Sequence, residues 1–163
     1  MQLIANGEVY NYIELRQELG VENFRTNSDC EPPLILYENN GIDYPEHLRG
    51  MFAIAIAEPN DNKICLTRDP FGIKPLYYTI LSNGVAFASE LSCLVETGLT
   101  SRKINKHSLQ ELLQLQFTLG TDTIFSDIKR VSPGESIEFK DGLITQRSQL
   151  PILPEEGPRN WTE

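Results

Sequence analysis

The stretch MFAIAIA (residues 51–57) alternates large and small apolar side chains. Neighbouring side chains of a β-strand point to opposite faces, so Phe52, Ile54 and Ile56 share one face and the three alanines share the other. A strand that is apolar on both faces is typical of a position between two layers. The alanine face allows a second layer to approach closely, and the stretch therefore predicts a central strand in a layered domain.

The sequence around this strand indicates antiparallel hairpins and short helices. A turn over 58–62 leads to a partner strand over 63–68, and two more hairpins turn at Asn83-Gly84 and Asp141-Gly142. The first strand is expected over 3–5, with Asn6-Gly7 at its end. Helices are expected over 12–19, 31–39, 90–97 and 108–117. Because hairpins and helices are grouped rather than alternating, the predicted fold class is α+β with mostly antiparallel sheets.

Polar residues before three of these helices predict their caps. Asn11 with Glu14 and Ser108 with Glu111 have the spacing of capping boxes. Asp29 is a candidate cap for the second helix, in which Pro32 and the next proline occupy the first turn.

Length and charge narrow the possible functions. A chain of 163 residues predicts one domain, here 1–150, followed by a Pro-containing tail or linker over 151–163. The net charge of −9 argues against nucleic acid or an anionic membrane as a partner. The sequence has no apolar run of membrane-spanning length and no signal-peptide pattern, and its three cysteines lack metal-like spacing, so a cytoplasmic protein with reduced thiols is expected.

Five short blocks, taken together and in order, resemble a class II glutamine amidotransferase domain. They are NGEVYN (6–11), NSDCE (27–31), LRGMFAIA (48–55), RDPFGIKPLYY (68–78) and FASE (87–90). The tyrosines in these blocks and the later TIFSDIKRVSPGE (123–135) favour the asparagine synthetase branch of that family.

The resemblance implies a fold and a reaction. The expected fold is the four-layer αββα sandwich of the N-terminal-nucleophile type. In that family a cysteine at the mature N-terminus attacks the side-chain amide of glutamine, and the released ammonia serves a second, ATP-using synthetase domain. ATP and Mg are therefore expected only in that other domain, and no cofactor is expected in this chain.

The resemblance also implies site residues. Asn6 and the backbone N–H of Gly7 match the oxyanion hole, two donors aimed at the charge of the tetrahedral intermediate. Asp29 matches the acidic residue that pairs with the α-ammonium group of glutamine, and Glu8 is expected to line the same pocket.

Simpler interpretations stay open beside these roles. Asn6-Gly7 alone is typical of a turn, and Asp29 alone is typical of a helix cap. Arg68 and Asp69 are expected to form a structural ion pair and turn at a strand end. His47 and His107 are expected at the surface, whereas Cys65 and Cys93 are expected in the core.

One feature of the family pattern is not found in this sequence. The nucleophilic Cys segment, which lies on a strand before the NGE block in the family, is absent, so the first strands of the fold are expected to be missing. Cys30 is a poor substitute, because the reaction uses the terminal amine of the nucleophile as its base. The chain is therefore expected to be incomplete and inactive as given, and to need the missing N-terminal segment or a synthetase domain, in cis or in trans, or a second copy of itself.

Three functions follow as hypotheses. The first is the glutaminase-type domain of an asparagine-synthetase-like enzyme, which supplies ammonia from glutamine to an ATP-dependent amidation. The second is a non-catalytic module that still binds glutamine or a related amino acid through Asn6, Gly7, Glu8 and Asp29. The third is a dimerisation module with an empty pocket.

Overall fold

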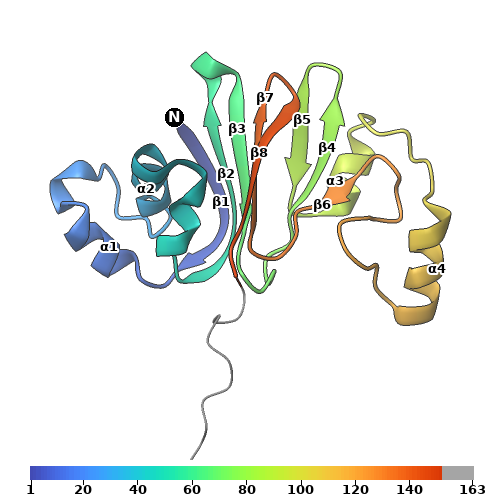
Figure 1. The fold of residues 1–163 in the computed structure, drawn as a ribbon, viewed down its shortest axis with the longest axis horizontal. Coiled ribbons are helices and arrows are strands. Elements are labelled where there is room, and N and C mark those ends of the chain that lie inside the picture. Colours follow the sequence, from blue (N-terminus) through green and yellow to red (C-terminus); the bar gives the residue numbers. More distant parts are fainter. Residues whose placement is uncertain (152–163) are drawn as a thin grey trace, which may run out of the picture.

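The computed structural model describes residues 1–151, which form four layers. Two antiparallel sheets stack at the centre, with helices on the outer face of each (Figure 1). This arrangement confirms the predicted α+β sandwich with antiparallel sheets. The predicted tail from residue 152 onward lies outside the described residues.

The larger sheet has five strands in the order β1-β2-β3-β7-β8, and all neighbours are antiparallel. The strands are β1 (Gln2–Val9), β2 (Gly50–Glu58), β3 (Lys63–Arg68), β7 (Glu135–Lys140) and β8 (Leu143–Gln149). Because β1 stands at one end of this order, its outer edge pairs with no strand of the described chain.

The smaller sheet has three strands in the order β5-β4-β6. They are β4 (Tyr77–Leu81), β5 (Gly84–Ala88) and the two-residue β6 (Lys129–Arg130). β5 also stands at one end of its sheet, so within the described chain its outer edge, like that of β1, has no partner strand.

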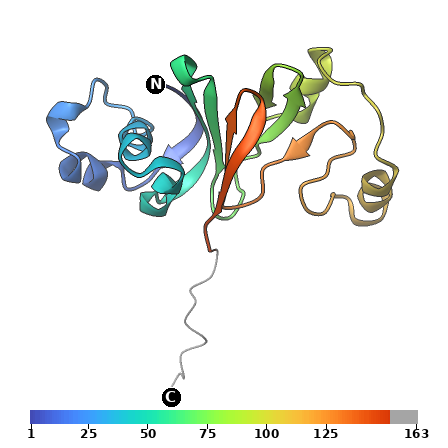
Figure 2. The ribbon, with the colours of Figure 1, turned by 45° about the horizontal axis from the view of Figure 1, so that its top comes forward.

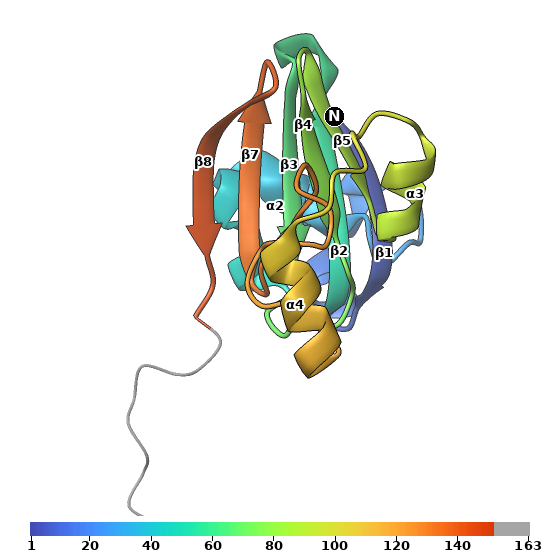
Figure 3. The ribbon, with the colours of Figure 1, turned by 90° about the vertical axis from the view of Figure 1, so that its right-hand side faces the viewer.

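The helices divide between the two sides of the sandwich (Figure 2). The first side holds α1 (Tyr12–Glu18), α2 (Pro32–Asn40) and the 3-10 turns η1 (Val21–Asn23) and η2 (Gly41–His47), and a third turn, η3 (Pro59–Asp61), joins β2 to β3. The second side holds α3 (Leu91–Glu96) and α4 (Lys106–Leu115). In the view of Figure 3, α3 and α4 lie in front of the sheets.

β2 separates the two parts of the hydrophobic core. Its large side chains, including Ile54 and Ile56, are fully buried among residues of α1, α2 and η2. Its alanines, including Ala53 and Ala55, belong to the cluster between the two sheets. The alternation in residues 51–57 therefore predicted correctly that this strand would be central.

Three local predictions were wrong because tertiary contacts use the polar groups differently. β1 continues to Val9, so Asn6 and Gly7 lie within a strand rather than at its end. The side chain of Asn11 makes no cap bond to α1. α4 begins at Lys106 with Asn105 as its cap, so Ser108 lies inside the helix and is buried.

The predicted positions of the surface histidines and the cysteines are confirmed with one exception. His47 and His107 are exposed, and Cys65 is fully buried on β3. Cys93 is exposed on α3 instead of lying in the core.

Candidate functional site

A depression of about 460 Å³ lies where β1 ends and the loop before α2 passes beside it. Its lining includes Glu8, Tyr10, Tyr12, Asn27, Ser28 and Asp29. The structure thus brings together two predicted site residues that are 21 positions apart, Glu8 and Asp29. Two carboxylates in one open depression favour a ligand with a positive charge.

A hydrogen bond holds Asp29 at this place. The backbone N–H of Val9 donates to Oδ2 of Asp29 over 2.9 Å. Asp29 is therefore not the cap of α2, as its sequence position suggested; α2 begins with Pro32 and has no side-chain cap bond. The carboxylate instead joins the loop to the end of β1.

Glu31 fixes the loop that carries Asp29. Its carboxylate accepts hydrogen bonds from the backbone N–H groups of Arg25 and Thr26 over 2.7 and 2.8 Å, and from the Thr26 hydroxyl over 2.6 Å. Desolvation opposes ionisation here, but the Thr26 and backbone hydrogen bonds outweigh it and lower the pKa of Glu31. The loop is closed around a carboxylate that stays charged.

Asn11 fixes the end of β1 from the other side. Its Nδ2 donates to the carbonyl of His47 over 2.9 Å, and its Oδ1 accepts the N–H of Arg49 over 2.8 Å. The N–H of Tyr10 also donates to the carbonyl of Arg49 over 2.7 Å. These bonds tie the end of β1 to the segment that leads into β2, and they explain why Asn11 does not cap α1.

Asn6 faces a different opening from Glu8 and Asp29. Its Nδ2 donates to Oγ of Ser89 over 3.2 Å, across the gap between β1 and the end of β5. Both residues line an opening of about 330 Å³ between the two sheets, whose walls include Ala53, Ala55 and Phe87. Of the four predicted site residues, Glu8 and Asp29 therefore share one opening, Asn6 lines another, and Gly7 lies between Asn6 and Glu8 on β1.

Gly7 lies between these openings and cannot carry a side chain in this backbone. Its φ of +153° is one that L-residues rarely adopt, and a Cβ would stand 2.1 Å from the carbonyl oxygen of Met51. Glycine is required because β1 and β2 approach closely at this point. The prediction that Gly7 donates its N–H to an oxyanion remains a prediction.

None of the three thiols lies in the depression beside Asp29. Burial, followed by the charge and the hydrogen bond of Asp29, raises the pKa of Cys30 from 9.0 to about 11. Burial raises the pKa of Cys65 to about 12. Cys30 lies just before α2, and although a helix start favours a thiolate, the neighbouring carboxylate of Asp29 has the opposite effect.

Arg68 and Asp69 are structural, as predicted, but they do not pair with each other. The guanidinium of Arg68 donates to three carbonyls, those of Gly72, Lys74 and Val131, over 2.6 to 2.9 Å. The buried carboxylate of Asp69 accepts three backbone N–H groups, from Phe71, Ile73 and Lys74. Both side chains fix the loop between β3 and β4.

Sequence reasoning missed two groups of residues that border the site. Ser89 had no assigned role, although it lies within the FASE block. Asn27 and Ser28 lie within the NSDCE block and were considered only as candidate caps of the helix over 31–39. Their membership in the quoted blocks was the available signal. Their contact with β1 depends on the tertiary fold.

Residues 1–151 contain neither a cluster of metal-ligating side chains nor a helix of membrane-spanning length. No group of three or more His, Cys, Asp or Glu side chains among them is placed to hold a metal ion. No helix among them is long and apolar enough to cross a bilayer.

The structural comparison and the family model indicate the same class of protein. The chain superposes on glutamine phosphoribosylpyrophosphate amidotransferase from Bacillus subtilis with a TM-score of 0.63 and 20% identity, over 90% of this chain and 28% of that one. This likeness shows the fold of an N-terminal-nucleophile type amidotransferase. The family model described as "Glutamine amidotransferase domain" matches residues 1–149, so the chain belongs to that family.

Relatives place the chain in the asparagine synthetase branch. Asparagine synthetase [glutamine-hydrolyzing] 1 of Bacillus subtilis is 42% identical over 162 residues, which are 94% of this chain and 26% of the relative. Asparagine synthetase [glutamine-hydrolyzing] 2 of the same organism is 45% identical over 111 residues, 68% of this chain and 15% of the relative. The chain therefore spans about a quarter or less of these relatives.

Proposed function

We propose that this chain forms the glutamine-recognition part of a glutaminase site and delivers ammonia to an asparagine-forming, ATP-dependent synthetase domain. The observation that supports it is the placement of Asp29 beside Glu8 in one depression, fixed by the Val9 hydrogen bond. An amino acid ligand carries an α-ammonium group, and two carboxylates give that group charge-assisted partners.

The carboxamide end of glutamine is proposed to lie toward Asn6 and Gly7. The amide of Asn6 and the N–H of Gly7 are the two donors that would stabilise the oxyanion of the tetrahedral intermediate. Removing one such donor typically slows a reaction by about 10²–10³. The present bond from Asn6 to Ser89 holds that amide at the mouth of the gap between the sheets.

The attacking thiol is proposed to come from a segment outside the 163 residues, supplied in cis or in trans. The apolar opening between the sheets and the free edges of β1 and β5 support this, since an added strand could pair with either edge. The thiol sulfur would bond to the carboxamide carbon, ammonia would leave, and water would release glutamate from the thioester. ATP and Mg belong to the synthetase domain, and no step on this chain uses them.

A second function is favoured by the environments of the three thiols. The pKa values of Cys30 and Cys65 are raised, and Cys93 lies on α3, outside the depression, so none of these thiols is placed as an activated nucleophile there. The second proposed function is therefore binding of glutamine without hydrolysis. In that case the same depression would serve as a glutamine-binding module.

Calorimetry and an ammonia assay test these functions together. Glutamine is titrated into the wild-type chain, into Asp29→Asn, and into the control Asp61→Asn, whose exposed carboxylate lies in the β2–β3 turn. We expect binding by the wild type and the control, and binding at least tenfold weaker by Asp29→Asn. Absence of wild-type binding, or equal binding by all three, would contradict the proposal.

The ammonia assay separates the two functions. The chain alone is expected to release no ammonia from glutamine. Release that begins when a peptide carrying the family's N-terminal cysteine segment is added supports the glutaminase function. If glutamine binds but no ammonia is released in the presence of this peptide, the result supports the binding module.

A further inference from the structure

Glu31 stands at the start of α2 but does not cap that helix. A cap side chain normally accepts N–H groups from the first turn of its own helix. Here Pro32 and Pro33 have no N–H to give, and the N–H of Leu34 donates to the backbone carbonyl of Glu31 over 3.0 Å. The Glu31 carboxylate therefore has no partner in α2 and can bond elsewhere.

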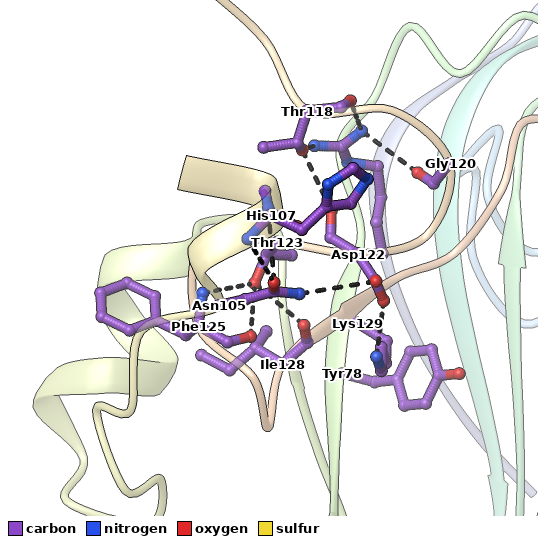
Figure 4. Close-up of polar contacts among 12 residues, drawn as sticks. Tyr78, Asn105, His107, Thr118, Gly120, Asp122, Thr123, Phe125, Ile128 and Lys129 are labelled. Carbon is purple, nitrogen blue, oxygen red and sulfur yellow. Dashed lines mark hydrogen bonds and ion pairs between the residues drawn. The ribbon is translucent and has the colours of Figure 1, made fainter. Parts of the chain in front are cut away.

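The start of α4 shows the usual arrangement for comparison (Figure 4). The Asn105 side chain there accepts the backbone N–H groups of His107 and Ser108 over 3.1 and 3.3 Å, within its own helix. The two neighbouring prolines account for the difference, because they leave the first two positions of α2 without donors. The sequence Glu-Pro-Pro thus directs its carboxylate away from the helix that it begins.

The carboxylate of Glu31 turns back to the loop that carries Asp29. It accepts two backbone N–H groups of that loop and the Thr26 hydroxyl. The Thr26 oxygen in turn accepts the N–H of Ser28 over 3.1 Å, and the Ser28 hydroxyl accepts the N–H of Cys30 over 3.2 Å. We call these bonds the loop relay. They run from Glu31 to the residues on both sides of Asp29.

The two carboxylate oxygens of Asp29 have different surroundings. Oδ2 accepts the N–H of Val9 over 2.9 Å, and the thiol of Cys30 donates to the same oxygen over 3.7 Å. Oδ1 has no hydrogen-bond partner within residues 1–151, and Asp29 lines the depression together with Glu8. The contacts of the loop therefore use one oxygen and leave the other for a ligand.

A cation on α1 lies beside the Glu31 carboxylate. Nη1 of Arg16 is 4.0 Å from Oε2 of Glu31, and both side chains are largely buried. The Arg16 guanidinium also lies over the ring of Phe24, 4.3 Å from its centroid. Desolvation raises the pKa of Glu31, but the hydrogen bonds of the loop and the charge of Arg16 together lower it below its usual value. An ionised acceptor makes stronger hydrogen bonds than a neutral one, so the loop relay depends on this charge.

We propose that Glu31 is a positioning residue of the glutamine site: acting through the loop relay, it holds Asp29 so that Oδ1 is presented to the α-ammonium group of the ligand. This inference rests on the proposed function, and it adds a residue that does not touch the ligand but sets its affinity. When only a fraction of the molecules has the loop ordered, the apparent affinity for the ligand falls by that fraction.

A double-mutant cycle tests whether Glu31 acts through Asp29. Glutamine affinity is measured by NMR titration for the wild type, Glu31→Gln, Asp29→Asn and the double variant. We expect Glu31→Gln alone to bind glutamine about tenfold more weakly, and to have no further effect beside Asp29→Asn, since the positioned charge is then gone. Equal losses in both backgrounds would overturn the inference, and so would an unchanged affinity of Glu31→Gln.

Matched variants separate the loop relay from a general effect of charge. Thr26→Val removes the hydroxyl of the relay at nearly constant volume and should weaken glutamine binding as Glu31→Gln does, whereas Thr26→Ser keeps the hydroxyl and should keep the wild-type affinity. Glu22→Gln makes the same charge change at an exposed carboxylate in η1 and should leave the affinity unchanged. Weakening by Thr26→Ser or Glu22→Gln to the level of Glu31→Gln would contradict the inference.

Hydrogen exchange at Val9 reports the position of Asp29 without any ligand. The bond to Oδ2 of Asp29 protects the Val9 N–H, so Glu31→Gln should speed exchange there and leave it unchanged at Ile54, in the centre of β2. Equal acceleration at both amides would mean that Glu31 stabilises the whole fold rather than the position of Asp29. Should Glu31→Gln fail to fold, Thr26→Val and Thr26→Ser are compared instead, and equal Val9 exchange in these two would overturn the inference.

The two readouts distinguish this inference from the proposed function. Glutamine binding by the wild type that Glu31→Gln does not change removes the inference alone. Faster Val9 exchange in Glu31→Gln, without glutamine binding by the wild type, removes the proposed function and leaves Glu31 as the residue that positions Asp29.

Discussion

The backbone N–H of Val9 donates a 2.9 Å hydrogen bond to the carboxylate of Asp29, and this bond joins β1 to a loop 20 residues away. Asp29 therefore has two roles that can be separated: an acceptor for a strand end and a negative charge beside Glu8. The first is a property of the observed fold, and the second is the basis of the proposed ligand site.

Substitution at Asp29 is expected to separate these roles. Asp29→Asn keeps an oxygen acceptor for Val9 and loses the charge, whereas Asp29→Ala loses both. We expect Asp29→Ala to lower the free energy of unfolding by about 1–3 kcal/mol, because the part-buried N–H loses its partner. Asp29→Asn should cost clearly less while still losing glutamine affinity. Urea unfolding measures the first effect, and equal losses of stability for both variants would refute the separation.

Gly7→Ala is expected to destabilise the larger sheet. The added Cβ would meet the Met51 carbonyl at 2.1 Å, and backbone is less able to move than a side chain. We expect a loss of about 1–3 kcal/mol or more. Gly84→Ala is the matched control, because a Cβ there would point into open space, with nothing but its chain neighbours within 4 Å. Thermal unfolding of the two variants gives the comparison, and similar melting temperatures would show that β1 and β2 can separate at Gly7.

Asp69→Asn is expected to loosen the loop between β3 and β4. An amide replaces one of two oxygens that together accept three N–H groups, so a donor then faces a donor in a fully buried site. We expect the free energy of unfolding to fall by about 1–3 kcal/mol, the usual penalty when a buried hydrogen-bonding group loses its partner. The penalty is larger when a charged partner is lost. Hydrogen exchange at Phe71, Ile73 and Lys74 reports it directly. Unchanged exchange at these three amides would contradict the assignment.

The thiols are expected to react in a fixed order. At neutral pH iodoacetamide should modify the exposed Cys93 first, Cys30 more slowly because its pKa is raised to about 11, and Cys65 only after unfolding. Mass spectrometry of the labelled peptides establishes the order. Early labelling of Cys30 would mean that its thiolate is accessible, and it would reopen its candidacy as a nucleophile.

The raised thiol pKa of Cys65 also predicts a pH dependence of stability. The folded state holds the proton that the unfolded thiol, with a pKa near 9.0, releases. The contribution of this protonated thiol to the free energy of unfolding is therefore complete below pH 9, and it is lost as the pH rises toward about 12. Urea unfolding of the wild type and of Cys65→Ser across this pH range isolates the contribution of the thiol. If the free energy of unfolding fell equally with pH in both proteins, the prediction would be contradicted.

Much of the fold could be predicted from local patterns. The alternation in residues 51–57 located β2 and the two core layers beside it, and the Asn-Gly and Asp-Gly pairs located the hairpins of β4–β5 and β7–β8. Helix caps were predicted poorly. The side chains of Asn11 and Asp29 can bond equally well to a helix start or to a distant strand, and the sequence does not state which backbone groups pass near them.

The candidate site, like the fold, could be predicted from the sequence only in part. The five blocks identified the family, and they named Asn6, Gly7, Glu8 and Asp29 as its candidate residues. They did not show that Asn6 meets Ser89 in one opening while Glu8 and Asp29 share another. Asn6 and Glu8 are two residues apart on β1 and so lie on the same face of the strand. They border different openings because Asn6 lies beside Ser89, which follows β5, whereas Glu8 lies beside the loop that carries Asp29.

The sequence by itself determined the central strand, the main hairpins and the family that the chain resembles, because hydrophobic alternation, turn residues and block order are local properties. Tertiary structure alone decided the partners of the polar side chains, the raised pKa of Cys30 and the exposure of Cys93. These depend on desolvation and on distances between segments that only the packed layers bring together.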